Sequence, residues 1–131
     1  MVTNDRTPIF VGVAQVEQRE DDPIAAREPL ELMVEAVEAA AADCGNPNIL
    51  TAADSVRVVR GIWGYGNPAR TVAERIGAPG AQTGITSLGG NYVQSLTNRS
   101  FLDIQSGKND VIIVTGGECG RTQGRALKAG I

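Results

Sequence analysis

The sequence predicts an α/β domain built on a four-stranded, mainly parallel sheet with helices on both faces. Short β-branched apolar runs alternate along the chain with amphipathic stretches at helical spacing, and glycines or prolines separate them. Such alternation implies right-handed crossovers, which place successive strands parallel and their helices over the sheet. The length of 131 residues suits one domain. We expect that domain over residues 1–122, followed by a poorly patterned tail at residues 123–131.

The first strand is expected at Pro8–Val16, a short apolar run broken at Gly12. An amphipathic helix then begins at Pro29, a residue suited to a first helical turn, and its apolar stripe continues to Cys44. Gly45 is a typical C-terminal cap for such a helix. Because Cys44 lies on the apolar stripe, we interpret it as a core thiol.

Three further strands are expected at Ser55–Ile62, Thr83–Leu88 and Asp110–Thr115. The last of them is the clearest in the chain, since it is apolar almost throughout. Strands buried on both faces have this composition, so the pattern predicts a central position for Asp110–Thr115 in a parallel sheet.

Two helices connect these strands. The first begins at Asn67, a capping residue that is followed by Pro68, and it stops at Gly77. The second follows Asn91, which can cap it, and Gly107 closes it. With the helix that begins at Pro29, the predicted order is strand and helix in strict alternation, ending on the fourth strand.

Composition and charge exclude several classes of partner. The formal net charge is −3 and no Lys/Arg cluster occurs, which disfavours nucleic acid because phosphate contacts need grouped cations. No apolar run approaches the length that crosses a membrane, and residues 1–8 lack the apolar core of a signal peptide. The two cysteines, Cys44 and Cys119, stand in no metal-binding or redox spacing. We therefore expect reduced thiols, no metal site and a cytoplasmic location.

The chain contains no histidine. This removes the Ser-His and Cys-His arrangements and the commonest general base near neutral pH. The glycine-rich stretch Gly61–Gly66 lacks the order of a dinucleotide fingerprint or a P-loop, and no lysine follows it. We therefore expect neither phosphate binding at this stretch nor catalysis through a histidine.

The order and spacing of several stretches resemble the thiolase family. One stretch runs from Gly89-Gly90-Asn91 through Gly107 and continues as DVIIVTGGE. The others are PIFVGVAQV, the acidic Ala-rich helix, DSVRVVRG and NPARTVAERIGAP. Over Pro8–Thr122 the chain is similar to the N-terminal part of thiolase-like acetyl-CoA acetyltransferases and sterol-carrier-type thiolases. The resemblance implies acyl transfer on acyl-CoA, as a substrate or ligand, without a covalently bound cofactor.

The same resemblance points to a missing nucleophile. In thiolases a cysteine stands at the start of the helix after the third strand, where the positive helix end lowers its pKa. Counted back from Gly107, that position is Gly90, which cannot form an acyl-enzyme. Ser87 and Ser95 are the nearest hydroxyls, but no histidine could activate either of them. Cys119, at the end of the fourth strand, is a second candidate nucleophile beside its interpretation as a small loop residue.

Thiolases also have a second, related half that carries an activating histidine and a proton-shuttling cysteine, and a loop domain that grips coenzyme A. The resemblance therefore implies a chain that is not competent for catalysis alone. We expect it to be completed by a second chain that supplies the C-terminal half, or to form a homodimer through the Thr83–Leu88 strand, because exposed sheet edges seek partners.

Two other functions stay open. Gly89, Gly90, Asn91, Gly116 and Gly117 are candidate anion-binding or acyl-binding positions, since backbone N–H groups ahead of a helix can hold an anion or a carbonyl. The chain would then be a non-catalytic thiolase-fold subunit for acyl-CoA or lipid-related ligands. The glycines could instead only permit a tight turn and close packing. A doubly wound α/β domain of unrelated function is the remaining possibility.

Overall fold

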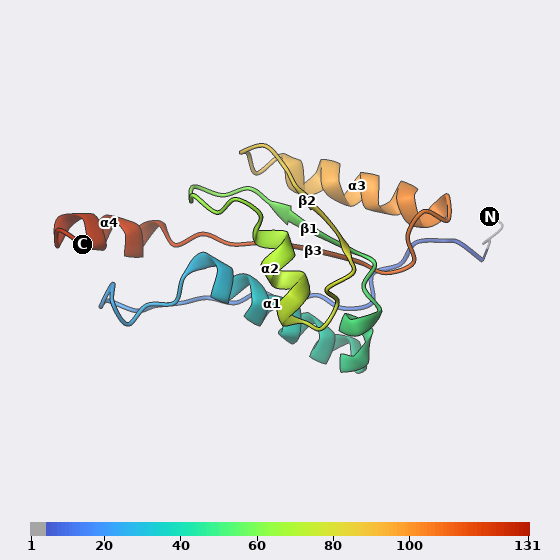
Figure 1. Cartoon of the computed structure of the whole chain (residues 1–131), viewed down its shortest axis with the longest axis horizontal. Helices are drawn as coiled ribbons and strands as arrows, with labels where there is room; N and C mark the ends of the chain where they lie inside the picture. Colours follow the sequence, from blue (N-terminus) through green and yellow to red (C-terminus); the bar gives the residue numbers. More distant parts are fainter. Residues whose placement is uncertain (1–4) are drawn as a thin grey trace.

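The structure, a computed structural model, describes residues 5–131 and has three layers (Figure 1). A three-stranded parallel sheet in the order β2-β1-β3 lies between helices α1 and α2 on one face and helix α3 on the other. The elements follow one another as α1 (Pro29–Cys44), the 3₁₀ helix η1 (Pro47–Ala52), β1 (Ser55–Val59), α2 (Pro68–Arg75), β2 (Gln82–Ile85), α3 (Tyr92–Gln105), β3 (Ile112–Gly116) and α4 (Gly120–Lys128). The parallel α/β class with helices on both faces is confirmed.

The prediction that Pro8–Val16 is the first of four strands is wrong, because the sheet has three strands and this segment is none of them. This segment is extended but pairs with no strand among residues 5–131. It is held by α1 instead, because the N–H of Val13 donates to Asp43 Oδ2 at 2.9 Å and Gly12 lies against the carbonyl of Ala40. An apolar run shows that a segment can be buried in a sheet. The segment is a strand only if a neighbouring strand pairs with it.

The prediction that Asp110–Thr115 is the central strand is also wrong. The strand in this region, β3, lies at one edge of the sheet, and β1 lies between β2 and β3. Ile112 and Ile113 are half-buried, and Val114 is 38% exposed. The composition of β3 is therefore that of a strand with both faces covered. One of its edges, however, has no neighbouring strand in the described chain.

The main core lies between the sheet and helices α1 and α2. Successive side chains of a strand point to opposite faces, so Val56 and Val58 of β1 face these helices and are fully buried. Around them lie apolar residues of the two helices: Met33, Val34, Val37, Ala69, Val72 and Ala73. Burial of this apolar surface is the main term that stabilises the layer.

The opposite face of β1 carries a polar contact to α3. Arg57 alternates with the two buried valines and is itself buried, 8% exposed. Its guanidinium donates to Ser100 Oγ at 3.0 Å and to Asp103 Oδ2 at 2.6 Å, and both acceptors belong to α3. The two faces of the sheet are therefore attached to their helices by different chemistry.

Helix ends follow the sequence signals in most places. Gly45 ends α1 with φ of 80°, a left-handed conformation that costs glycine little. The Asn67 side chain caps α2 by accepting from the N–H of Arg70 at 3.2 Å. Asn91 stands at the N-cap of α3 but makes no side-chain capping bond.

The last helix lies where the sequence suggested little pattern. Helix α4 covers much of residues 123–131, has no buried residue, and projects from the end of the molecule without contact to another helix or strand (Figure 1). No helix within residues 5–131 is both long and apolar enough to cross a membrane. The expectation about a signal peptide falls partly on residues 1–4, which lie outside the described residues.

Candidate functional site

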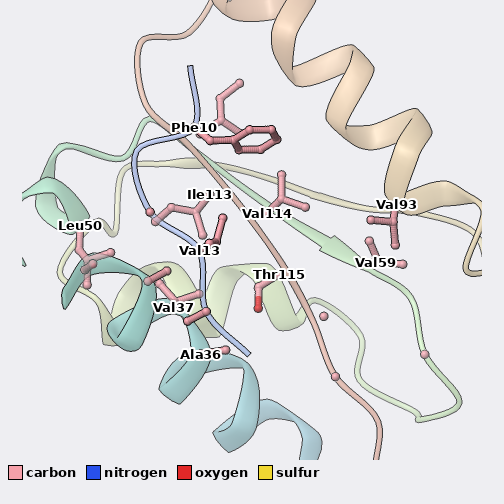
Figure 2. Close-up of a pocket in the computed structure, with 18 of the residues that line it drawn as sticks. Phe10, Val13, Ala36, Val37, Leu50, Val59, Val93, Ile113, Val114 and Thr115 are labelled. Atoms are coloured by element: carbon pink, nitrogen blue, oxygen red, sulfur yellow. The ribbon is translucent and has the colours of Figure 1, made fainter. Parts of the chain in front are cut away.

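A cavity of about 700 Å³ lies between the extended N-terminal segment, α1 and β3. Figure 2 shows Val37 of α1, Ile113 and Val114 of β3, and Phe10 and Val13 of the N-terminal segment around it. Most lining side chains are apolar. Arg60 and Glu118 are the charged residues of the lining, and both follow the carboxyl ends of strands. The cavity thus has an apolar body and a polar end.

Four of the five predicted binding positions lie at this cavity. Gly89, Gly90, Gly116 and Gly117 all line it, although they come from two loops separated by the whole of α3. The fifth, Asn91, does not line it. The loops meet because β1, β2 and β3 are parallel, so the carboxyl ends of all three strands lie at the same end of the sheet.

The backbone before α3 has part of the donor geometry that an anion or carbonyl would need. The N–H groups of Tyr92 and Val93 are already used, because they donate to the carbonyls of Gly89 and Gly90 at 3.1 and 3.3 Å. The N–H groups of Gly89, Gly90 and Asn91 have no acceptor within residues 5–131. These three donors are the ones that a ligand oxygen could take at this helix end.

Gly116 and Gly117 have a packing role. A Cβ on Gly116 would meet Val59 of β1 at 3.4 Å, and a Cβ on Gly117 would lie 3.2 Å from the carbonyl oxygen of Pro29. The pair therefore lets the chain leave β3 closely past β1 and the start of α1. This favours the close-packing interpretation for these two glycines, whereas no such contact surrounds Gly90.

Glu118 organises the polar end of the cavity. Its Oε1 accepts from the N–H of Ile62 at 2.8 Å, and the Trp63 indole donates to the carbonyl of Gly117 at 2.9 Å. These bonds tie the loop after β1 to the loop after β3. The stretch Gly61–Gly66 is therefore a tethered loop, and its first two residues, Gly61 and Ile62, line the cavity. The signal for Glu118 was its place directly after Gly116-Gly117 at a strand end.

Cys119 is not among the residues that line the cavity, although it directly follows Glu118, which does. Its Sγ lies 3.4 Å from the carbonyl oxygen of Arg27 and 4.0 Å from Nε2 of Gln18. Burial, together with the neighbouring Glu118 carboxylate, raises the pKa of the Cys119 thiol, although Arg27 acts in the opposite direction. A thiol that stays protonated near neutral pH is a poor nucleophile.

Cys44 does line the cavity, which the sequence did not indicate. It is half-buried at the last residue of α1, whereas Gly117 lies beside Pro29 at the first residue. A helix of 16 residues separates its first and last residues by about 22 Å. The cavity therefore holds no thiol at its polar end, and Ser87 and Ser95 do not line it. No cluster of residues within the described range could hold a metal ion.

Comparison with known proteins supports one relationship. The chain is similar to the crystal structure of a monomeric SCP2-thiolase-like protein type 1 from Mycobacterium smegmatis, with a TM-score of 0.77 and 34% sequence identity. The match covers 88% of this chain and 24% of that one, so the chain spans about a quarter of the length of its relative. No protein-family model and no curated protein matches the chain. The chain therefore has the fold of part of a thiolase-like protein. This agrees with the resemblance of its sequence to the N-terminal part of thiolases.

Proposed function

We propose that this thiolase-like chain is the N-terminal part of an acyl-CoA acyltransferase of the acetyl-CoA acetyltransferase type and does not catalyse acyl transfer alone. The observation that carries the proposal is Gly90. It lies at the N-terminal end of α3, where the helix would activate a thiol, and it faces open space beside the apolar cavity. The position has the surroundings of a nucleophile without the nucleophile.

The magnitudes support inactivity of the chain alone. Acyl transfer needs a thiolate, a base to form it and an acid or base for the substrate proton. Backbone donors before α3 could only bind and polarise a carbonyl. One oxyanion donor contributes about 3–4 kcal/mol in an intact site, but only after a nucleophile has attacked the carbonyl, and Gly90 provides no nucleophile. A typical enzymatic acceleration requires at least about 8 kcal/mol.

The test is thiolysis of acetoacetyl-CoA by the purified chain, followed by loss of the thioester–enolate absorbance. We expect no turnover above a matched heat-denatured sample, and no acyl adduct in the intact mass. Turnover that disappears in Cys119→Ala would overturn the proposal and make Cys119 the nucleophile. Turnover that persists in Cys119→Ala would also overturn the proposal, and it would show that another residue is the nucleophile.

A second candidate function is a non-catalytic subunit that binds acyl-CoA or a lipid-related ligand. The apolar body of the cavity favours it, because an acyl chain would be covered by α1 and β3 while its carbonyl reached Gly89 and Gly90. Calorimetric titration with acetyl-CoA and with decanoyl-CoA separates the two functions. Tight binding that strengthens with chain length, without turnover, favours the binding subunit.

The partner belongs to the same proposal. A second chain that supplies the rest of a thiolase would complete the site, and a cytoplasmic location would keep both free cysteines reduced. The other candidate is a copy of this chain. The strand in the range Thr83–Leu88 is β2, Gln82–Ile85, which lies at the edge of the sheet opposite β3. The monomeric state of the Mycobacterium smegmatis relative gives this second candidate no support.

A further inference from the structure

Helix α4 is held against the rest of the molecule by polar side chains. It has no buried residue, and it contacts no other helix or strand within residues 5–131. The Gln123 side chain donates to the carbonyl of Ile62 at 2.9 Å. The Arg125 guanidinium donates to the carbonyl of Glu20 at the same distance. Apolar burial, the main stabilising term in the core, therefore contributes little to the position of this helix.

The basic side chains of α4 lie on one face of the helix. Arg121, Arg125 and Lys128 are separated by four and three residues, a spacing that places side chains on the same side of a helix. The helix contains no acidic residue. The basic face meets Asp21, whose Oδ1 lies 2.8 Å from Nη1 of Arg125 and 4.0 Å from Nη2 of Arg121. A single carboxylate therefore pairs with two of the three cations.

Asp21 is presented by a loop that has its own support. It belongs to the acidic stretch of residues 17–22, which lies at the same end of the molecule as α4 (Figure 1). The Gln18 side chain accepts from the N–H of Arg27 at 2.8 Å and donates to the Arg27 carbonyl at 3.1 Å. These bonds close the loop without any residue of α4. The loop is therefore the fixed side of the contact, and α4 is the side that can move.

The fold of α4 itself depends on this contact. The helix has nine residues, no side-chain bond at its N-cap, and Gly124 in its middle. Helices shorter than about 12–15 residues are marginal in water even with good helix formers. Exposed ion pairs contribute little each, and salt screens them. The docked helix and an undocked, unfolded segment are therefore close in free energy.

We propose that α4 is a charge-controlled helix. It is folded and docked while Asp21 pairs with Arg121 and Arg125, and it unfolds when that pairing is screened or removed. A change between order and disorder of this kind needs only a small difference in free energy, because the two states are nearly balanced.

Release of α4 would loosen the loop after β1. Ile62 lines the cavity, and its carbonyl accepts the bond from Gln123. Without α4 that loop keeps its bonds to Glu118 and to the carbonyl of Gly117, but it loses the bond to Gln123. The helix thereby controls how firmly the loop is held at the candidate site. This control does not depend on acyl transfer, because it concerns the folding of α4 alone.

Hydrogen exchange with mass spectrometry on the purified wild-type chain tests the proposal. Labelling times from milliseconds to seconds suit a short exposed helix. Raising sodium chloride from 10 mM to 1 M shortens the Debye length from about 30 Å to about 3 Å. We expect residues 123–128 to exchange roughly threefold faster at 1 M, the scale set by exposed ion pairs. The Ile62 amide should also exchange faster, whereas α2 should change little.

Two pairs of variants make the test specific. Arg125→Gln removes a paired cation, and Lys128→Gln removes a cation of the same face that has no partner within residues 5–131. Asp21→Asn removes the acceptor, and Asp110→Asn removes an exposed carboxylate that pairs with Arg6 instead. At 10 mM salt, Arg125→Gln and Asp21→Asn should exchange in α4 as the wild type does at 1 M. The two controls should keep the wild-type rates and the wild-type response to salt.

Three outcomes would overturn the proposal. They are exchange in wild-type α4 that does not respond to salt, equal acceleration in Arg125→Gln and Lys128→Gln, and a full salt response that persists in Asp21→Asn. Faster exchange of α4 with an unchanged Ile62 amide would overturn the control of the loop. Thioester turnover is measured separately, so its presence or absence leaves this result unchanged.

Discussion

Arg57 is the residue whose burial demands the most compensation. Its guanidinium donates to Ser55, Ser100, Asp103 and Asn109, at distances between 2.6 and 3.2 Å. These acceptors belong to β1, to α3 and to the loop that precedes β3. A buried charge is tolerated when it is paired and hydrogen-bonded in this way. The network therefore sets the position of α3 over the sheet.

Removing the carboxylate from this network should destabilise the protein strongly. Asp103→Ala leaves the Arg57 guanidinium buried without its counter-charge, a change that costs about 3–5 kcal/mol. Urea unfolding followed by circular dichroism measures the free energy of unfolding. The control is Asp110→Ala, whose pair with Arg6 is exposed and should contribute less than about 1 kcal/mol. Equal losses in the two variants would contradict the role of Arg57.

Asp103 should also make stability depend on pH. Burial acts to raise its pKa, but the hydrogen bond and charge of Arg57 outweigh burial and hold that pKa below its ordinary value. A carboxyl with a lowered folded pKa stabilises the protein fully above its unfolded pKa of about 3.9. That contribution is lost as pH falls through the folded value. Urea titrations between pH 7 and pH 3 should show a steeper acid loss in wild type than in Asp103→Asn.

The surroundings of Gly90 predict a reactive thiol if one is introduced. A Cβ there meets no atom within 4 Å, so Gly90→Cys should fold normally. The N-terminal end of α3 should lower the pKa of the new thiol below the usual value of about 8.5. Peptide mapping after iodoacetamide at pH 7 should show faster labelling at position 90 than at Cys119. Slower labelling at position 90 would show that the helix end does not activate this position.

At the scale of elements, the docking of residues 9–16 on α1 depends on a glycine. A Cβ at position 12 would overlap the carbonyl oxygen of Ala40, a backbone atom that cannot move alone. Gly12→Ala should therefore displace the segment, with a cost of about 1–3 kcal/mol. Hydrogen exchange at the Val13 amide, which donates to Asp43, should accelerate. Gly124→Ala in α4 is the control, since its Cβ meets no atom within 4 Å.

At the scale of the whole molecule, the sheet has two open edges, β2 and β3, in the described chain. Open edges favour association. If copies of the chain pair through β2, sedimentation velocity at rising concentration will show a dimer that Ile85→Lys removes. Ile85 is 38% exposed and does not line the cavity beside β3. A monomer at all concentrations would exclude the homodimer and leave the second chain as the partner.

The helices could be located from sequence because their signals are local. Pro29, Gly45 and Asn67 mark helix ends through bonds within a few residues, and the structure places α1 and α2 where they indicate. The gathering of Gly89, Gly90, Gly116 and Gly117 could be inferred as well. Parallel strands bring the loops at their carboxyl ends together, so the predicted alternation already implied that these glycines meet.

The sequence alone determined the parallel α/β class, the thiolase resemblance and the absence of a nucleophile at Gly90, since each depends on residue identity and spacing. Only the tertiary structure decided that Pro8–Val16 is no strand, that β3 is an edge strand and that Cys119 does not line the cavity. The physical reason is that strand pairing depends on a neighbour distant in sequence. An apolar run indicates that a segment must be shielded from water, but it does not indicate whether another part of the chain shields it.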